Sequence, residues 1–83
     1  MEPSQRQLRV GEIVRHAVSE VFSRGELRDP ALETAVITVP EVRMSPDLKV
    51  ATVYVLPLGG RDREATLAGL RRERVVIRNA IKR

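Results

Sequence analysis

Two stretches rich in Val, Ile, Thr and Tyr, residues 36–44 and 48–56, are separated by a polar turn. Side chains of these types favour a pleated, half-buried surface. In the turn, the Ser45 hydroxyl can bond the backbone that follows it, and Pro46 presets φ for the second turn position. The pattern therefore predicts a β-hairpin. Pro40 interrupts the first arm and cannot donate to a strand ladder, so it indicates a bulge or an edge position.

The residues before the hairpin place apolar side chains at helical spacing. Ser4 and Gln7 form a capping box that starts the helix, and Gly25 stands where a glycine would end it. Gly11 lies inside the helix at a cost of about 1 kcal/mol relative to alanine, which predicts close packing there. The apolar positions are Val10, Ile13, Val14, Ala17, Val18, Val21 and Phe22.

The residues after the hairpin predict two helices rather than one, with Asp62 as a candidate N-cap. Four apolar side chains fall within about 80° of one another on a helical projection, and in a straight helix Arg74 would project into the middle of that face. Burying an unpaired guanidinium is very unfavourable. The pattern therefore predicts a kink near residues 71–74, which turns Arg71, Arg72 and Arg74 outward together. The four apolar residues are Leu67, Leu70, Ile77 and Ile81.

The connection between the first helix and the hairpin, residues 25–35, contains Asp29-Pro30, which can start a short turn, and Leu32, which is expected to point inward. The order of elements is then helix, strand, strand, helix, kink, helix, in the α+β class. Two strands alone make a marginal sheet, and the sequence stops at Arg83 in mid-pattern. We therefore expect one domain over residues 1–83 that is truncated at its C-terminal end and lacks a last strand.

Composition is that of a small globular domain, with 42% hydrophobic and 31% charged residues. Cysteine is absent, which excludes disulfides and thiolate metal sites. The first residues lack the apolar core of a signal peptide, and no apolar run is long enough to span a bilayer. We expect a soluble, cytoplasmic protein that is a monomer.

The charge of the chain is unevenly distributed. Residues 1–70 hold nine basic and ten acidic side chains, whereas residues 71–83 hold six basic side chains against Glu73 alone. This asymmetry favours a polyanion partner, and arginine, which supplies thirteen of the fifteen basic residues, suits phosphate well. Because Phe22 and Tyr54 are the only aromatic residues, base stacking is not expected. The candidate phosphate ligands are Arg71, Arg72, Arg74, Arg78, Lys82 and Arg83, with Arg9 and Arg15 of the first helix as outer candidates and Arg6 beside them.

Two other groups of residues have a weaker claim to function. Glu12, His16 and Glu20 are spaced four apart on the outer side of the first helix, as in a metal stripe, and His16 with Ser19 could suggest a catalytic pair. One helix supplies neither the remaining ligands nor an orienting third group. Gly59-Gly60 lacks the rest of a phosphate-loop pattern. A solvated face and a flexible turn are the better interpretations, and no catalytic site, cofactor or metal is expected.

Several stretches resemble the ribosome-binding factor A family. They are residues 5–12, 25–30, 37–48 and 51–55, with a looser match over 67–70 and 77–78. The patterns R-V-G-E at residues 9–12 and V-x-x-S-P-D-L at residues 42–48 are fairly specific together, and the resemblance covers nearly the whole chain.

The resemblance implies a type II KH-like fold, in which two helices joined by a kink replace the usual Gly-x-x-Gly phosphate loop. It implies a non-catalytic assembly factor that binds the small (30S) ribosomal subunit and its 16S rRNA. Such a factor assists late maturation and 5′-end processing, and matters most in the cold. Many relatives have an Ala-x-Gly triplet at the kink, where this chain has Glu73-Arg74-Val75. Relatives also continue into a third strand.

Charge and resemblance together predict rRNA binding through the kinked helices, with no membrane or small-molecule partner. One alternative is a protein-interaction module that uses an unpaired sheet edge, with the basic segment as a solvated surface. Salt would barely weaken such binding. The other alternative is a membrane-surface protein that uses its basic amphipathic end, although that segment lacks Trp and Phe.

Overall fold

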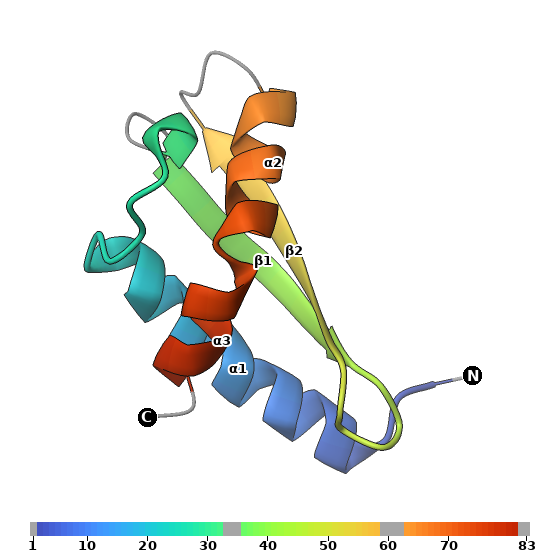
Figure 1. Ribbon diagram of the computed structural model, residues 1–83. Coiled ribbons are helices and arrows are strands. Elements are labelled where there is room, and N and C mark those ends of the chain that lie inside the picture. Colours follow the sequence, from blue (N-terminus) through green and yellow to red (C-terminus); the bar gives the residue numbers. More distant parts are fainter. Residues whose placement is uncertain (1, 33–35, 59–62, 82–83) are drawn as a thin grey trace.

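The computed structural model describes residues 2–32, 36–58 and 63–81, and it shows three α-helices with a two-stranded antiparallel sheet (Figure 1). This arrangement confirms the predicted order of elements and the α+β class, and it is consistent with a KH-like fold. A third strand stays a prediction. The elements in chain order are α1 (Gln5–Ser23), the 3₁₀ helix η1 (Pro30–Leu32), β1 (Val36–Met44), β2 (Ala51–Leu58), α2 (Arg63–Arg72) and α3 (Arg74–Ile81).

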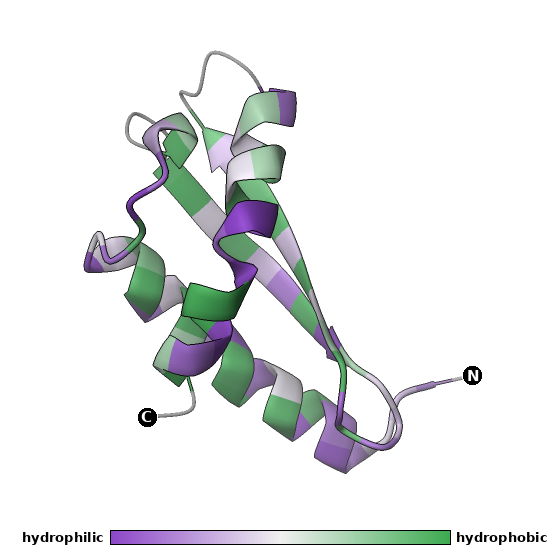
Figure 2. Ribbon diagram, in the orientation of Figure 1, coloured by the Kyte–Doolittle hydropathy of each residue, from purple (hydrophilic) through white to green (hydrophobic). Residues whose placement is uncertain are grey.

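Helix α1 begins at the predicted capping box. The Ser4 amide donates to Gln7 Oε1 at 2.8 Å, and the Gln7 amide donates to Ser4 Oγ at 3.1 Å. Gln7 Nε2 also donates to the Met44 carbonyl at 3.0 Å, which ties the start of α1 to the end of β1. Beyond the last turn, Gly25 adopts a φ of 66°, as predicted for a glycine that ends a helix. Figure 2 shows apolar and polar residues alternating along α1, as the helical spacing predicts.

Removing the cap should weaken the whole domain, because Gln7 serves both the helix start and the end of β1. We expect Ser4→Ala to lower the free energy of unfolding by about 1 kcal/mol. Urea unfolding followed by circular dichroism measures this, and Gln5→Ala, one residue further along the exposed first turn, serves as the control. Equal stability of the two variants would contradict a structural role for the cap.

The hairpin contains the bulge that Pro40 indicates. Thr38 faces Leu56 and Glu41 faces Tyr54, so two residues of β1 stand opposite a single residue of β2. In a regular strand, side chains alternate between the two faces. The extra residue shifts this alternation by one, which keeps apolar side chains of both halves of β1 on the inner face. These inner residues are Ile37 and Val39 before the bulge, and Val42 and Met44 after it.

The turn of the hairpin is longer than the sequence predicts. Strand β2 begins at Ala51 instead of residue 48 and continues to Leu58. The reason lies in the turn, where Leu48 has a positive φ of 62° and the Ser45 amide donates to the Val50 carbonyl at 2.9 Å. The Val50 amide in turn donates to Ser45 Oγ at 3.0 Å. The local bonds of Ser45 therefore close a turn over residues 45–50.

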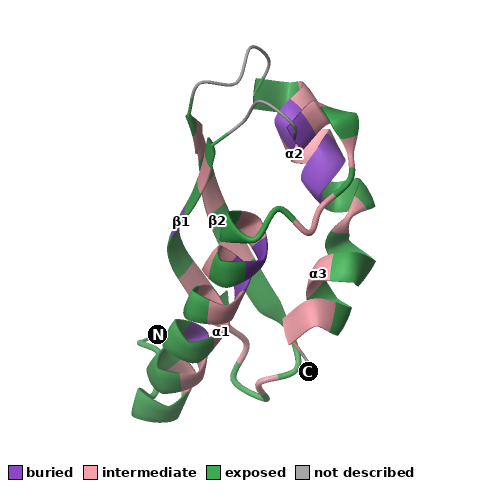
Figure 3. Cartoon of the chain, turned by 90° about the vertical axis from the view of Figure 1, so that its left-hand side faces the viewer, coloured by how far each residue is buried: buried purple, intermediate pink, exposed green. Residues whose placement is uncertain are grey.

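The core lies where α1 crosses β1. Val18, Val21 and Val39 are buried there, and Figure 3 shows buried residues on α1 and α2. A Cβ on Gly11 would lie 2.8 Å from the Val42 carbonyl oxygen, so the close packing that Gly11 predicts is confirmed. Helix α3 packs against α1, and α2 packs against η1, where Leu32 is buried as predicted. This packing fixes the position of Glu73, the residue between α2 and α3, which we call the joint.

Candidate nucleic-acid interface

A kink separates α2 from α3 at Glu73, as the charge pattern predicts. The Glu73 amide donates to the Gly69 and Leu70 carbonyls at 3.1 and 3.2 Å, which completes the last turn of α2. The Glu73 carbonyl accepts from the Ile77 amide at 2.9 Å, which opens α3. One residue thus closes one helix and starts the next, and no glycine is needed. Figure 2 shows the end of α2 and the joint as a hydrophilic stretch.

Three arginines at this joint present unpaired charge to solvent. Arg71 is in the last turn of α2, and Arg74 and Arg78 lie one turn apart on α3. All three are exposed, and none has an acidic partner among the described residues. We call Arg71, Arg74 and Arg78 the kink arginines. Their positive charge and exposure suit phosphate oxygens.

Arg72 is exposed like its neighbours but is already paired. Its Nε donates to Asp29 Oδ2 at 2.6 Å, and its Nη2 donates to Asp29 Oδ1 at 3.0 Å. The Asp29 side chain, which lies just before η1, is only 10% exposed. The Arg72 guanidinium, together with the Ala31 amide, lowers the pKa of the Asp29 carboxyl below its usual value. Arg72 therefore differs from the kink arginines, although the sequence places it among them.

We expect the stabilisation that Asp29 provides to be lost in acid. Its pKa is lower in the folded protein, so the contribution is complete above the unfolded pKa, about 3.9 for aspartate, and disappears as the pH falls through the folded value. Urea unfolding of the wild type and Asp29→Asn, from neutral pH toward acid, measures this. The difference in unfolding free energy should shrink as the pH falls. A difference that stays constant would show that ionisation of Asp29 adds no stability.

The outer candidates on α1 lie apart from one another. Arg9 is exposed and has no partner among the residues that the structure describes. Arg15 pairs with Glu12 at 2.5 Å and reaches the Val39 carbonyl at 3.4 Å. Arg15 lies about 160° around the helix from Ala17, which lines the contact with α3. The structure thus turns Arg15 toward the bulge of β1. Lys82 and Arg83 lie outside the described residues.

The remaining candidates show no further chemistry. The His16 ring lies 3.3 Å from Glu12 on the exposed side of α1, and Glu20 pairs with Arg24 at 3.5 Å. Within residues 2–32, 36–58 and 63–81, no three His, Cys, Asp or Glu side chains gather as metal ligands would. Gly59-Gly60 and Asp62 lie outside this part of the chain.

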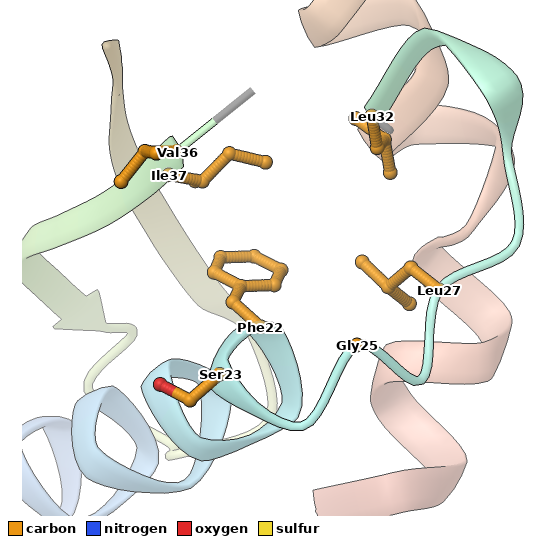
Figure 4. Close-up of a pocket in the computed structure, with 7 residues that line it drawn as sticks. All are labelled: Phe22, Ser23, Gly25, Leu27, Leu32, Val36 and Ile37. Atoms are coloured by element: carbon orange, nitrogen blue, oxygen red, sulfur yellow. The ribbon is translucent and has the colours of Figure 1, made fainter. Parts of the chain in front are cut away.

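A hollow of about 260 Å³ lies between the end of α1, η1 and the start of β1 (Figure 4). Phe22, Leu27, Leu32 and Ile37 point toward one another across it. None of its lining residues is ionisable, and the hydroxyl of Ser23 points away from the apolar side chains in Figure 4, so the hollow offers mainly apolar contact. Among the described residues, the candidate site for an anionic ligand is therefore the positive charge at the joint.

Comparison with known proteins identifies the family. A sequence model described as "Ribosome-binding factor A" matches residues 6–83. The chain belongs to the ribosome-binding factor A family. The resemblance seen in the sequence is thereby confirmed.

Ribosome-binding factor A proteins of two bacterial genera illustrate the relationship. The protein of Methylobacterium radiotolerans is 62% identical over 81 residues, which cover 98% of this chain and 57% of the relative. That of Rhodopseudomonas palustris is 65% identical over 80 residues, which cover 96% of this chain and 58% of the relative. The chain thus spans less than two thirds of the length of these relatives. None of the helices described here is long and apolar enough to cross a membrane.

Sequence reasoning on this member of the ribosome-binding factor A family missed Asp29 and Glu73. Asp29 is 43 residues away from Arg72 in the chain, and Glu73 Oε1 accepts from the Arg28 amide at 3.2 Å across a similar separation. Acidic residues next to a turn or within a basic segment are common, so neither position carries a signal by itself. Only the fold brings these residues together.

Proposed function

We propose that this chain binds the small (30S) ribosomal subunit and its 16S rRNA, and assists late maturation and 5′-end processing without catalysing a reaction. Its relatives are named ribosome-binding factors. The observation that supports the proposal best is the group of kink arginines, Arg71, Arg74 and Arg78, exposed and unpaired among the described residues. The proposal includes action in the cytoplasm and greatest importance in the cold.

The chemistry of the joint favours contact with RNA phosphates rather than with bases. The two aromatic side chains of the protein are elsewhere: Phe22 lines the apolar hollow, and Tyr54 lies on β2 with Arg43 5.7 Å from its ring centre. Without an aromatic platform on α2 or α3, only the arginine guanidinium planes offer a surface for base stacking, so contact with phosphates is favoured. Three phosphate contacts would give a slope of log affinity against log salt of about −2 to −3.

Cosedimentation with purified 30S subunits, at two salt concentrations, tests this function. Purified 50S subunits and an unrelated structured RNA of similar length serve as comparisons. We expect selective binding to the 30S subunit that weakens steeply with salt. Equal binding to the 30S subunit, the 50S subunit and the unrelated RNA would indicate that the kink arginines bind any RNA without selectivity. Absence of binding by the folded protein at low salt would refute the proposal.

A protein-interaction module remains the second candidate, supported by the outer face of the hairpin. Val36, Tyr54, Leu56 and Leu58 are all exposed there. Binding through such apolar side chains responds little to salt. Retention of 30S binding at high salt would therefore favour this candidate over contact through the kink arginines.

A further inference from the structure

The joint between α2 and α3 is held at two points by the segment just before η1. Asp29 receives three N–H groups: two from the Arg72 guanidinium, at 2.6 and 3.0 Å, and the Ala31 amide at 3.0 Å. Glu73 Oε1 accepts the Arg28 amide at 3.2 Å. Two consecutive residues at the joint thus bind two consecutive residues of the segment before η1. We call these four residues, Arg28, Asp29, Arg72 and Glu73, the clasp.

The packing beneath the clasp makes this attachment close. A Cβ on Gly69, one turn before the joint, would lie 3.2 Å from side-chain atoms of Ala31 and Leu32, and 3.3 Å from Asp29 Oδ1. Thr66, on the preceding turn, is buried. The last turns of α2 therefore rest directly on η1, and the clasp fixes the residue at which α2 stops.

The direction of α3 depends on where the helix breaks, and the local backbone does not determine that residue. Residues 73–75 contain no glycine or proline, so nothing in the local backbone forces a break there. A continuous helix through residue 74 would instead turn the Arg74 side chain toward the apolar face formed by Leu70 and Ile77. Binding Arg72 and Glu73 to a segment outside the helix holds the break in place and leaves Arg74 exposed.

We propose that Asp29 and Arg72 are positioning residues of the RNA interface, and that Arg72 does not itself contact phosphate. Asp29 neutralises the Arg72 charge, and moving Arg72 to a phosphate would leave a nearly buried carboxylate without its cation. The clasp instead orients the kink arginines on both sides of the joint. This inference rests on the function proposed above, because it assigns a role within the same interface.

Substituting Asp29 should change the affinity for 30S subunits in opposite directions for the two possible roles of Arg72, phosphate ligand or positioning residue. If Arg72 were a phosphate ligand restrained by Asp29, then Asp29→Asn would remove a negative charge, release Arg72 and strengthen 30S binding. A positioning role predicts that Asp29→Asn weakens binding, by roughly tenfold. Glu20→Gln is the control for charge, because it removes one negative charge from the exposed side of α1 and leaves the clasp intact. It should leave affinity unchanged or slightly higher.

Substitution of Arg72 separates a positioning role from a direct phosphate contact. Arg72→Lys keeps the charge, which would suffice for a phosphate contact, but loses the two-pronged bond to Asp29. We expect it to weaken 30S binding while the salt slope stays at the wild-type value. Arg71→Gln should instead reduce the magnitude of the slope by about 1. A reduced slope in Arg72→Lys and tighter binding by Asp29→Asn would each overturn the inference.

Hydrogen exchange of the free protein separates this inference from the proposed function. Asp29→Asn should speed exchange of the Glu73 and Ile77 amides, which close α2 and open α3, whereas the Val18 amide in the core of α1 should keep its protection. Unchanged exchange at Glu73 and Ile77 would overturn the clasp even if 30S binding were confirmed. Faster exchange there, in a protein that fails to bind 30S subunits, would refute the proposed function while the clasp stands as a feature of the fold.

Discussion

Reversing the charge of Arg71 and Arg74 together should weaken association with 30S subunits about 100-fold at low salt. Each substitution to glutamate removes a phosphate contact and adds a repulsion at the same place. Neither side chain has a partner among the described residues, so the fold should lose little stability. Cosedimentation or a filter-binding titration, with circular dichroism to confirm folding, measures the effect.

The control for this charge reversal is Lys49→Glu. Lys49 is exposed in the turn between β1 and β2, at the other end of β1 from η1, on which α2 packs. Its reversal changes the net charge by two units, half of the change in the double variant. If the protein binds rRNA through its overall positive charge, Lys49→Glu will therefore reduce log affinity about half as much as the double variant. If it binds through the kink arginines, Lys49→Glu will have almost no effect. Undiminished binding by the Arg71→Glu, Arg74→Glu variant would remove these residues from the interface.

Replacing Gly11 by alanine should destabilise the fold by about 1–3 kcal/mol, although alanine is the better helix former. The added Cβ would lie 2.8 Å from the Val42 carbonyl oxygen, where α1 crosses β1. This oxygen belongs to the strand backbone and cannot rotate away as a side chain would. The helix and the strand must therefore move apart, and contacts of buried neighbours such as Val18 would loosen.

Urea unfolding of Gly11→Ala against the wild type tests this packing. Arg9→Ala, at an exposed position of the same helix, serves as the control and should be neutral or slightly stabilising. A more stable Gly11→Ala protein would mean that α1 and β1 cross at a larger distance than the structure shows.

The fold could be predicted wherever its cause lies within a few residues. Ser4 and Gln7 are three residues apart and cap each other, and Pro40 disturbs the strand that contains it. The kink was also predictable, because Arg74 conflicts with the apolar spacing around it. The start of β2 was not, because the positive φ of Leu48 depends on how the bonds of Ser45 close the turn.

The candidate interface was predictable as a segment but not residue by residue. The excess of arginine near the C-terminal end identifies the region, and the exposure of Arg71, Arg74 and Arg78 agrees with it. Counting charges gives Arg72 the same weight as Arg71, whereas the structure pairs Arg72 with a residue 43 positions earlier. Arg15 is a second arginine whose partner could not be predicted from the sequence, since its bond to the Val39 carbonyl depends on tertiary packing.

The bulge at residues 39–40 also determines where the length of this chain can vary. β1 has one residue more than β2 at this point, so deleting one bulge residue would leave a regular strand in which Ile37, Val39, Val42 and Met44 still face inward. Deleting a residue from the regularly paired part of β1, such as Arg43, would instead turn the residue beyond it, Met44, to the outer face. One residue added to the turn at 45–50 has no such effect, because it lies outside both strands. We therefore expect single-residue insertions and deletions among relatives to occur at the bulge and in the turn, and to be excluded from the regularly paired residues of β1.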